Sequence, residues 1–141
     1  MRLAVKPYPS CRYTHAAMDA IRQIMRDEGV TADEVESVEI GLPLTGMKIV
    51  SFPEEAKHNP ESVVDGQFSM PFCAAVVLRE GTMLWDHYAT HLKDPETLAL
   101  TKKITCVNDP EVEALFPANM AGKATVKTPR GTFSAFVDMP K

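Results

Sequence analysis

Residues 123–137 read Lys123-Ala124-Thr125-Val126-Lys127-Thr128, then Pro129-Arg130-Gly131, then Thr132-Phe133-Ser134-Ala135-Phe136-Val137. The two outer segments contain β-branched and aromatic residues, which favour strands. Proline and glycine on either side of Arg130 are typical of a tight reversal of the chain. The stretch therefore predicts a β-hairpin with strands at residues 123–128 and 132–137.

Two further segments have strand character. In residues 35–42 apolar and polar or small residues alternate, so Val38, Ile40 and Leu42 are expected to face a core. Pro43 lacks a backbone N–H group and is expected to end the strand. Residues 104–107 predict a short strand. Between residues 43 and 60 turn-forming residues predominate, and there we predict a loop with one short strand at residues 47–50.

Two longer helices are predicted. Between residues 14 and 28 apolar side chains recur at spacings of three and four, which predicts an amphipathic helix that Gly29 ends. A second helix is predicted from residue 62 or 65 to residue 81. Gly66 and Pro71 make its first part irregular, whereas its second part is apolar on all sides and is expected to be buried.

Shorter helical pieces are predicted at residues 86–92 and 95–103, with a helical turn around Val112 and Leu115. Strands and helices are therefore mixed rather than strictly alternating. We predict an α+β fold in a single domain, residues 1–141, with an antiparallel sheet of three to four strands and two longer helices packed on one face.

The composition fits one globular domain without a membrane span. The 141 residues are 45% hydrophobic and 24% charged, with a net charge of −4 and no basic run, which argues against nucleic acid or an anionic membrane as a partner. The longest apolar run, residues 72–78, is far shorter than the roughly 20 residues that a membrane helix needs. Three cysteines without a C-x-x-C pair predict reduced thiols and a cytoplasmic protein.

The densest polar chemistry lies in residues 6–15, Lys6-Pro7-Tyr8-Pro9-Ser10-Cys11-Arg12-Tyr13-Thr14-His15. Each proline fixes its own φ and favours an extended residue before it, so the start of this stretch is stiff. Ser10 and Thr14 are candidate helix N-caps, and the free N–H groups of a helix start attract anions. Lys6 and Arg12 add positive charge, so the stretch predicts a site for carboxylates.

This stretch, together with residues 67–76 and Gly81, resembles the C-terminal domain of MmgE/PrpD proteins, a family that includes 2-methylcitrate dehydratase and cis-aconitate decarboxylase. The resemblance covers nearly the whole chain. It implies a lyase or isomerase that acts on small di- or tricarboxylates without a metal or another cofactor. It also implies a large helical domain followed by a smaller α+β lid domain, in a full-length homodimer.

Only the lid is matched. We therefore expect a helical domain upstream of this sequence to supply much of the active site, and the chain alone to be inactive. Two alternatives stay open. The chain could be a module that binds small carboxylates without catalysis, or an assembly domain that docks on the missing domain or on another copy of itself.

Eliminating water or CO2 from a polycarboxylate requires an acid or base near the reacting carbon and cations that hold the carboxylates. We assign Lys6 to charge stabilisation or proton transfer, and His15 to an acid/base or hydrogen-bonding role. Arg12 is assigned to a bidentate carboxylate clamp, and Ser10 to substrate binding. The alternatives are that Lys6 and Arg12 are solvated and that Ser10 and His15 cap or pack against the helix.

Two other groups could carry chemistry. Cys11 has no base that the sequence places beside it, so a packing thiol is favoured over a nucleophile. His87 and His91 are four residues apart, which on a helix is a metal-ligand spacing. No H-E-x-x-H pattern accompanies them, and we predict no metal site there.

Overall fold

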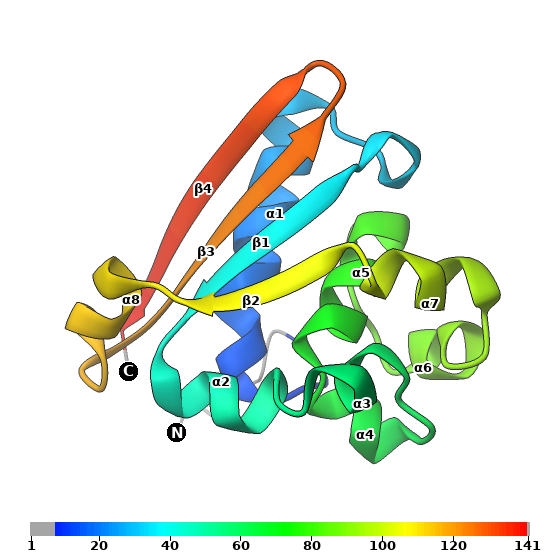
Figure 1. Cartoon of the computed structure of the whole chain (residues 1–141), viewed down its shortest axis with the longest axis horizontal. Helices are drawn as coiled ribbons and strands as arrows, with labels where there is room; N and C mark the ends of the chain where they lie inside the picture. The colour runs from blue at the N-terminus through cyan, green and yellow to red at the C-terminus, as the bar shows by residue number, and fades with distance from the viewer. Residues whose placement is uncertain (1–7, 141) are drawn as a thin grey trace, which may run out of the picture.

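Strands and helices are mixed along residues 8–140, the part of the chain that the computed structural model describes (Figure 1). The strands are β1 (Ser37–Leu42), β2 (Ile104–Asn108), β3 (Asn119–Thr128) and β4 (Gly131–Pro140). The α-helices are α1 (His15–Glu28), α2 (Leu44–Val50), α3 (Glu54–His58), α4 (Val63–Gln67), α5 (Met70–Glu80), α6 (Asp86–His91), α7 (Pro95–Thr101) and α8 (Pro110–Leu115). Short 3-10 helices are η1 (Arg12–Thr14) and η2 (Ala32–Glu34). The predicted α+β class is confirmed.

The sheet is mixed, which corrects the prediction of a purely antiparallel one. Its strand order is β2-β1-β3-β4, and β1 pairs with β2 in parallel, whereas β1–β3 and β3–β4 are antiparallel. A parallel pair needs a long crossover connection. Residues 43–103, which contain α2 to α7, provide that connection and return the chain to the starting end of β1.

The predicted hairpin is confirmed and is longer than the sequence indicated. β3 and β4 pair from Asn119 opposite Pro140 to Thr128 opposite Gly131, where the chain turns. At the tip, the Arg130 guanidinium donates to both carboxylate oxygens of Glu34, at 2.6 and 3.2 Å. Because Glu34 also closes a capping box with Thr31, the hairpin tip is joined to η2.

The core lies between the sheet and the two longer helices. α1 packs across β3 and β4, behind the sheet in Figure 1, and α5 packs against α1 and β2. The contact between α1 and β3 is close, since a Cβ atom on Gly122 would lie 2.7 Å from the backbone nitrogen of Ala17. All residues of α5 from Met70 to Leu78 are buried, as its apolar sequence predicted.

Two element predictions need correction. Residues 47–50 belong to helix α2 rather than to a strand, and Gly46 in that helix lies against the ring of Tyr13, where a Cβ atom would be 2.7 Å from the ring. The predicted second helix is divided into α4 and α5 at residues 68–69. The division occurs at Ser69, whose hydroxyl accepts the Phe72 N–H (3.1 Å) and caps α5.

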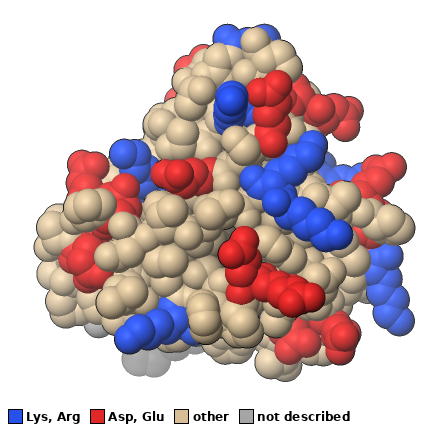
Figure 2. Space-filling view, in the orientation of Figure 1, with Lys and Arg blue, Asp and Glu red and all other residues tan. Residues whose placement is uncertain are grey.

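The face of the sheet opposite α1 carries polar side chains such as Glu39 and Lys127. Figure 2 shows this side of the molecule, with acidic and basic side chains intermingled and no large field of one sign. None of the helices described within residues 8–140 is long and apolar enough to cross a membrane.

Candidate functional site

Residues 8–14, which we call the lead-in segment, make a tight turn and then enter η1 and α1 without a break. The Ser10 N–H donates to the Tyr8 carbonyl oxygen (2.9 Å), and the Cys11 N–H donates to the carbonyl oxygen of Gln67 (2.9 Å). Thr14 occupies the N-cap position of α1 but forms no side-chain cap. The lead-in segment is thus fixed by its own turn and by α4.

Tyr8 anchors the start of this segment. Its side chain is only 2% exposed, and its hydroxyl donates to the carboxylate of Asp19 and accepts from Arg22 Nη1 at 3.1 Å. Burial is the main reason that the pKa of Tyr8 is raised to about 12, so the hydroxyl keeps its proton at neutral pH. The sequence indicated neither Asp19 nor Arg22 as partners of Tyr8.

Ser10, Thr14 and His15 form a buried polar cluster. The hydroxyl oxygens of Ser10 and Thr14 are 2.7 Å apart, and the Thr14 hydroxyl donates to the Cys11 carbonyl oxygen at 2.6 Å. His15 is 4% exposed, and its Nε2 lies 3.0 Å from the carbonyl oxygen of Ser10. Because a carbonyl oxygen only accepts, Nε2 carries a proton, and this bond holds the turn at Ser10.

Arg12 is oriented differently from these neighbours. It is exposed, and within the described part of the chain no hydrogen bond or ion pair holds its guanidinium. Its five N–H donors are therefore available to an anionic ligand. Lys6 lies outside the described residues.

The cysteines are free thiols in this structure. Cys11 is half-buried, and Cys73 of α5 is fully buried with its Sγ 3.4 Å from the Gly66 carbonyl oxygen. Burial raises the pKa of Cys73 to about 12 and that of Cys106 to about 12. These two thiols are therefore protonated at neutral pH and are poor nucleophiles.

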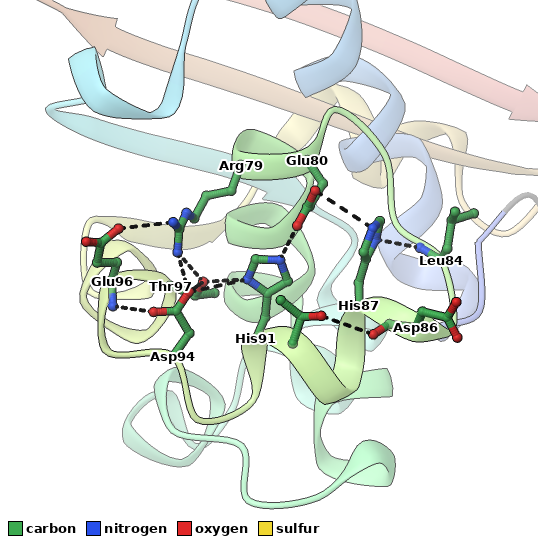
Figure 3. Close-up of polar contacts among 10 residues, drawn as sticks. Arg79, Glu80, Leu84, Asp86, His87, His91, Asp94, Glu96 and Thr97 are labelled. Carbon is green, nitrogen blue, oxygen red and sulfur yellow. Dashed lines mark hydrogen bonds and ion pairs between the residues drawn. The ribbon is translucent and has the colours of Figure 1, made fainter.

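The two histidines at metal-ligand spacing face one carboxylate (Figure 3). Glu80 Oε2 lies 2.6 Å from His91 Nε2, and Glu80 Oε1 lies 3.9 Å from His87 Nε2. The Leu84 N–H donates to His87 Nδ1 (3.0 Å), so the ring proton of His87 resides on Nε2, where it blocks coordination. Within residues 8–140 no group of three His, Cys, Asp or Glu side chains is arranged to hold a metal ion.

His91 belongs instead to a network that joins α5, α6 and α7 (Figure 3). The ring is 3% exposed, and its Nδ1 lies 2.7 Å from the hydroxyl of Thr97. That hydroxyl accepts from Arg79 Nη1 at 2.8 Å, and Arg79 also donates to Asp94 at 2.5 Å. The bond to His91 is the largest cause that lowers the pKa of Glu80. These contacts give the cluster a structural role.

Fold and site together define a class of protein: a small α+β domain that presents an arginine on a rigid turn at the start of its first helix. Residues 8–141 match the model of the MmgE/PrpD C-terminal domain, and the chain therefore belongs to that family. Among curated proteins no significant match to the chain is found.

Proposed function

We propose that this chain is the C-terminal domain of a metal-independent lyase that acts on small di- or tricarboxylates, in the manner of 2-methylcitrate dehydratase. One observation supports the proposal most directly: Arg12 is exposed with its donors available, while Tyr8, Ser10 and His15 fix the backbone on either side of it. A guanidinium with unengaged donors on a fixed backbone suits bidentate recognition of a carboxylate.

In this proposal Arg12 binds a substrate carboxylate, and Lys6 stabilises charge or transfers a proton. The contacts of His15 support its hydrogen-bonding role, because the buried ring holds the Ser10 carbonyl group. The contact between the Ser10 and Thr14 hydroxyls supports the packing alternative for Ser10. No cofactor is required for these roles.

We propose that a helical domain outside this sequence completes the site. Several large apolar side chains are exposed near the lead-in segment, and Trp85 is 62% exposed. The Trp85 ring contacts Tyr88, whose hydroxyl donates to the Pro9 carbonyl oxygen, and Tyr88 also contacts Gly66 of α4. The other exposed apolar residues of α4 and its surroundings are Val63, Val64, Phe68 and Leu84. Such an apolar surface is typical of a domain interface.

We further propose that the full-length protein is a cytoplasmic homodimer.

Assays of the chain alone test whether it is complete as a catalyst. We expect no turnover of 2-methylcitrate, citrate or cis-aconitate, because groups outside the chain are required. Measurable turnover would contradict this expectation. Light scattering on the same sample distinguishes the assembly alternative, in which a stable oligomer forms without any carboxylate binding.

Calorimetry tests the carboxylate site itself. We expect di- and tricarboxylates to bind the chain, and Arg12→Ala and Lys6→Ala each to weaken binding by roughly tenfold or more, the loss of one charge-assisted contact. Lys127→Ala, on the opposite face of the sheet, is the matched control and should leave binding unchanged. Equal heats for all four proteins would remove Lys6 and Arg12 from the site.

A further inference from the structure

An open groove of about 840 Å3 runs along the second half of α1. It is lined by Asp19, Arg22 and Arg26 of α1, by Thr31, and by Gly81 at the end of α5. Asp19 and Arg22 are the two residues that hold the hydroxyl of Tyr8. The groove therefore begins at the anchor of the lead-in segment, beside the stretch that carries the proposed carboxylate site.

Arg22 is held in this groove by a neutral partner. Its Nη1 donates to the Tyr8 hydroxyl at 3.1 Å, and its guanidinium carbon lies 6.0 Å from the centre of the Tyr8 ring. The Asp19 carboxylate accepts a hydrogen bond from the Tyr8 hydroxyl, and in the described part of the chain no carboxylate forms an ion pair with Arg22. The guanidinium is thus oriented by the buried tyrosine while its charge is not neutralised by direct pairing.

Arg26 follows Arg22 by four residues, which places both side chains on the same face of α1. Its Nε donates to Asp27 at 3.2 Å on the exposed surface, a type of pair that water screens strongly. The groove is lined by two guanidinium groups and one carboxylate, Asp19, which is engaged by Tyr8. Its charged groups favour an anion with two separate acceptor groups.

We propose that Arg22, positioned by Tyr8, binds a carboxylate of the substrate in this groove, with Arg26 as a second contact. The proposal rests on the proposed function and makes it more specific. The two guanidinium groups that line the groove, those of Arg22 and Arg26, hold different carboxylates of one molecule, so the groove selects di- and tricarboxylates over monocarboxylates. Tyr8 is a positioning residue, because it acts through Arg22.

The test is an NMR titration of the whole chain that follows the arginine Nε–Hε signals and the backbone amides. Citrate, acetate and inorganic phosphate are added at matched ionic strength. We expect the Arg22 signal and the Cys11 and Arg12 amides to shift together and saturably with citrate, whereas acetate and phosphate cause small, unsaturated shifts. Arg22→Gln should weaken citrate binding by roughly tenfold or more, the loss of one charge-assisted contact.

Three variants distinguish a role of Tyr8 in positioning Arg22 from a purely structural role. Arg22→Lys should restore part of the affinity, because the charge returns without the planar fork. Tyr8→Phe keeps the buried ring and removes the hydroxyl, and should weaken citrate binding less than Arg22→Gln while altering the Arg22 Nε–Hε signal in the free protein. Arg130→Gln, at the hairpin tip, is the matched control and should bind citrate like the original chain.

Each of the other outcomes would contradict the role of Arg22, the proposed function, or both. Shifts of the Cys11 and Arg12 amides without a shift of Arg22 would refute the role of Arg22 and leave the proposed function intact. A shift of Arg22 alone would make the groove a separate anion site and count against the proposed function. Phosphate binding as tight as citrate binding would refute a carboxylate site, and the absence of any saturable shift would refute both proposals.

Discussion

The hydroxyl of Tyr88 donates a hydrogen bond to the carbonyl oxygen of Pro9, 2.5 Å away, and ties α6 to the lead-in segment. The Tyr88 ring stacks on Phe72 of α5, with ring centres 6.1 Å apart. It also lies so close to Gly66 of α4 that a Cβ atom there would be 3.0 Å from the ring. One buried tyrosine therefore fixes the position of the lead-in segment relative to α4, α5 and α6.

We predict that Tyr88→Phe lowers the free energy of unfolding by roughly 1–2 kcal/mol, because the Pro9 carbonyl group loses its partner in a partly buried place. Denaturant unfolding measures this change. Tyr13→Phe is the matched control, since the Tyr13 hydroxyl has no hydrogen bond within the described part of the chain. Similar losses for both variants would show that the bond to Pro9 contributes little.

Packing between α1 and the sheet gives a second prediction. Ile21 is fully buried on the face of α1 that meets the core, whereas Ile49 of α2 is 38% exposed. Ile21→Ala should cost about 2–5 kcal/mol of unfolding free energy, the range for a buried residue that leaves a cavity. Ile49→Ala removes the same atoms and should cost clearly less. If the two losses were equal, the assigned core face of α1 would be wrong.

The elements that the sequence predicted well have local causes. The spacing in α1, the alternation in β1 and the turn at residues 129–131 lie within short stretches, and the structure contains all three. The direction of β2 has no local cause, because the path of residues 43–103 decides whether that strand runs parallel to β1. Helix α2 also depends on a distant part of the chain, because its Gly46 packs against Tyr13. The helix is too short for a helical periodicity to be recognised in the sequence.

The same distinction applies to the candidate site. Composition and the two prolines indicated the lead-in segment, but they could not show that His15 is turned inward while Arg12 is exposed. Asp19 and Arg22 are polar residues of an amphipathic helix, and nothing in the neighbouring sequence marks them as partners of Tyr8. Their contact with Tyr8 joins residues 11 and 14 positions apart, and only the folded chain brings them together.

The Glu80 carboxylate makes the stability of the fold depend on acid pH. Its bond to His91, followed by the charges of neighbouring groups, lowers its pKa from the ordinary value of 4.5. The bond therefore contributes stability above the unfolded-state pKa, and this contribution is lost as pH falls through the lower folded-state pKa. We predict that the free energy of unfolding falls between about pH 5 and pH 3, and that Glu80→Gln makes this decline shallower.

Unfolding by urea at a series of pH values measures the slope. Glu111→Gln is the control, because the Glu111 side chain forms no ion pair or hydrogen bond in the described part of the chain. It should leave the slope unchanged. An identical slope for the original chain and Glu80→Gln would contradict the assignment.

The hydroxyl of Thr97 joins Arg79 and His91 in the fully buried centre of the network between α5, α6 and α7. Thr97→Val keeps the shape of the side chain and removes the hydroxyl, so the buried Nδ1 of His91 loses its partner. We predict a loss of about 1–3 kcal/mol of unfolding free energy, the cost of leaving a buried polar group unsatisfied.

Thr90→Val on α6 is the matched control, because the Thr90 hydroxyl is exposed and its bond to the Asp86 carbonyl oxygen is long, at 3.4 Å. The imidazole NMR signals of His91 should shift in Thr97→Val and not in Thr90→Val. A loss without that shift would place the cost in packing rather than in the hydrogen bond.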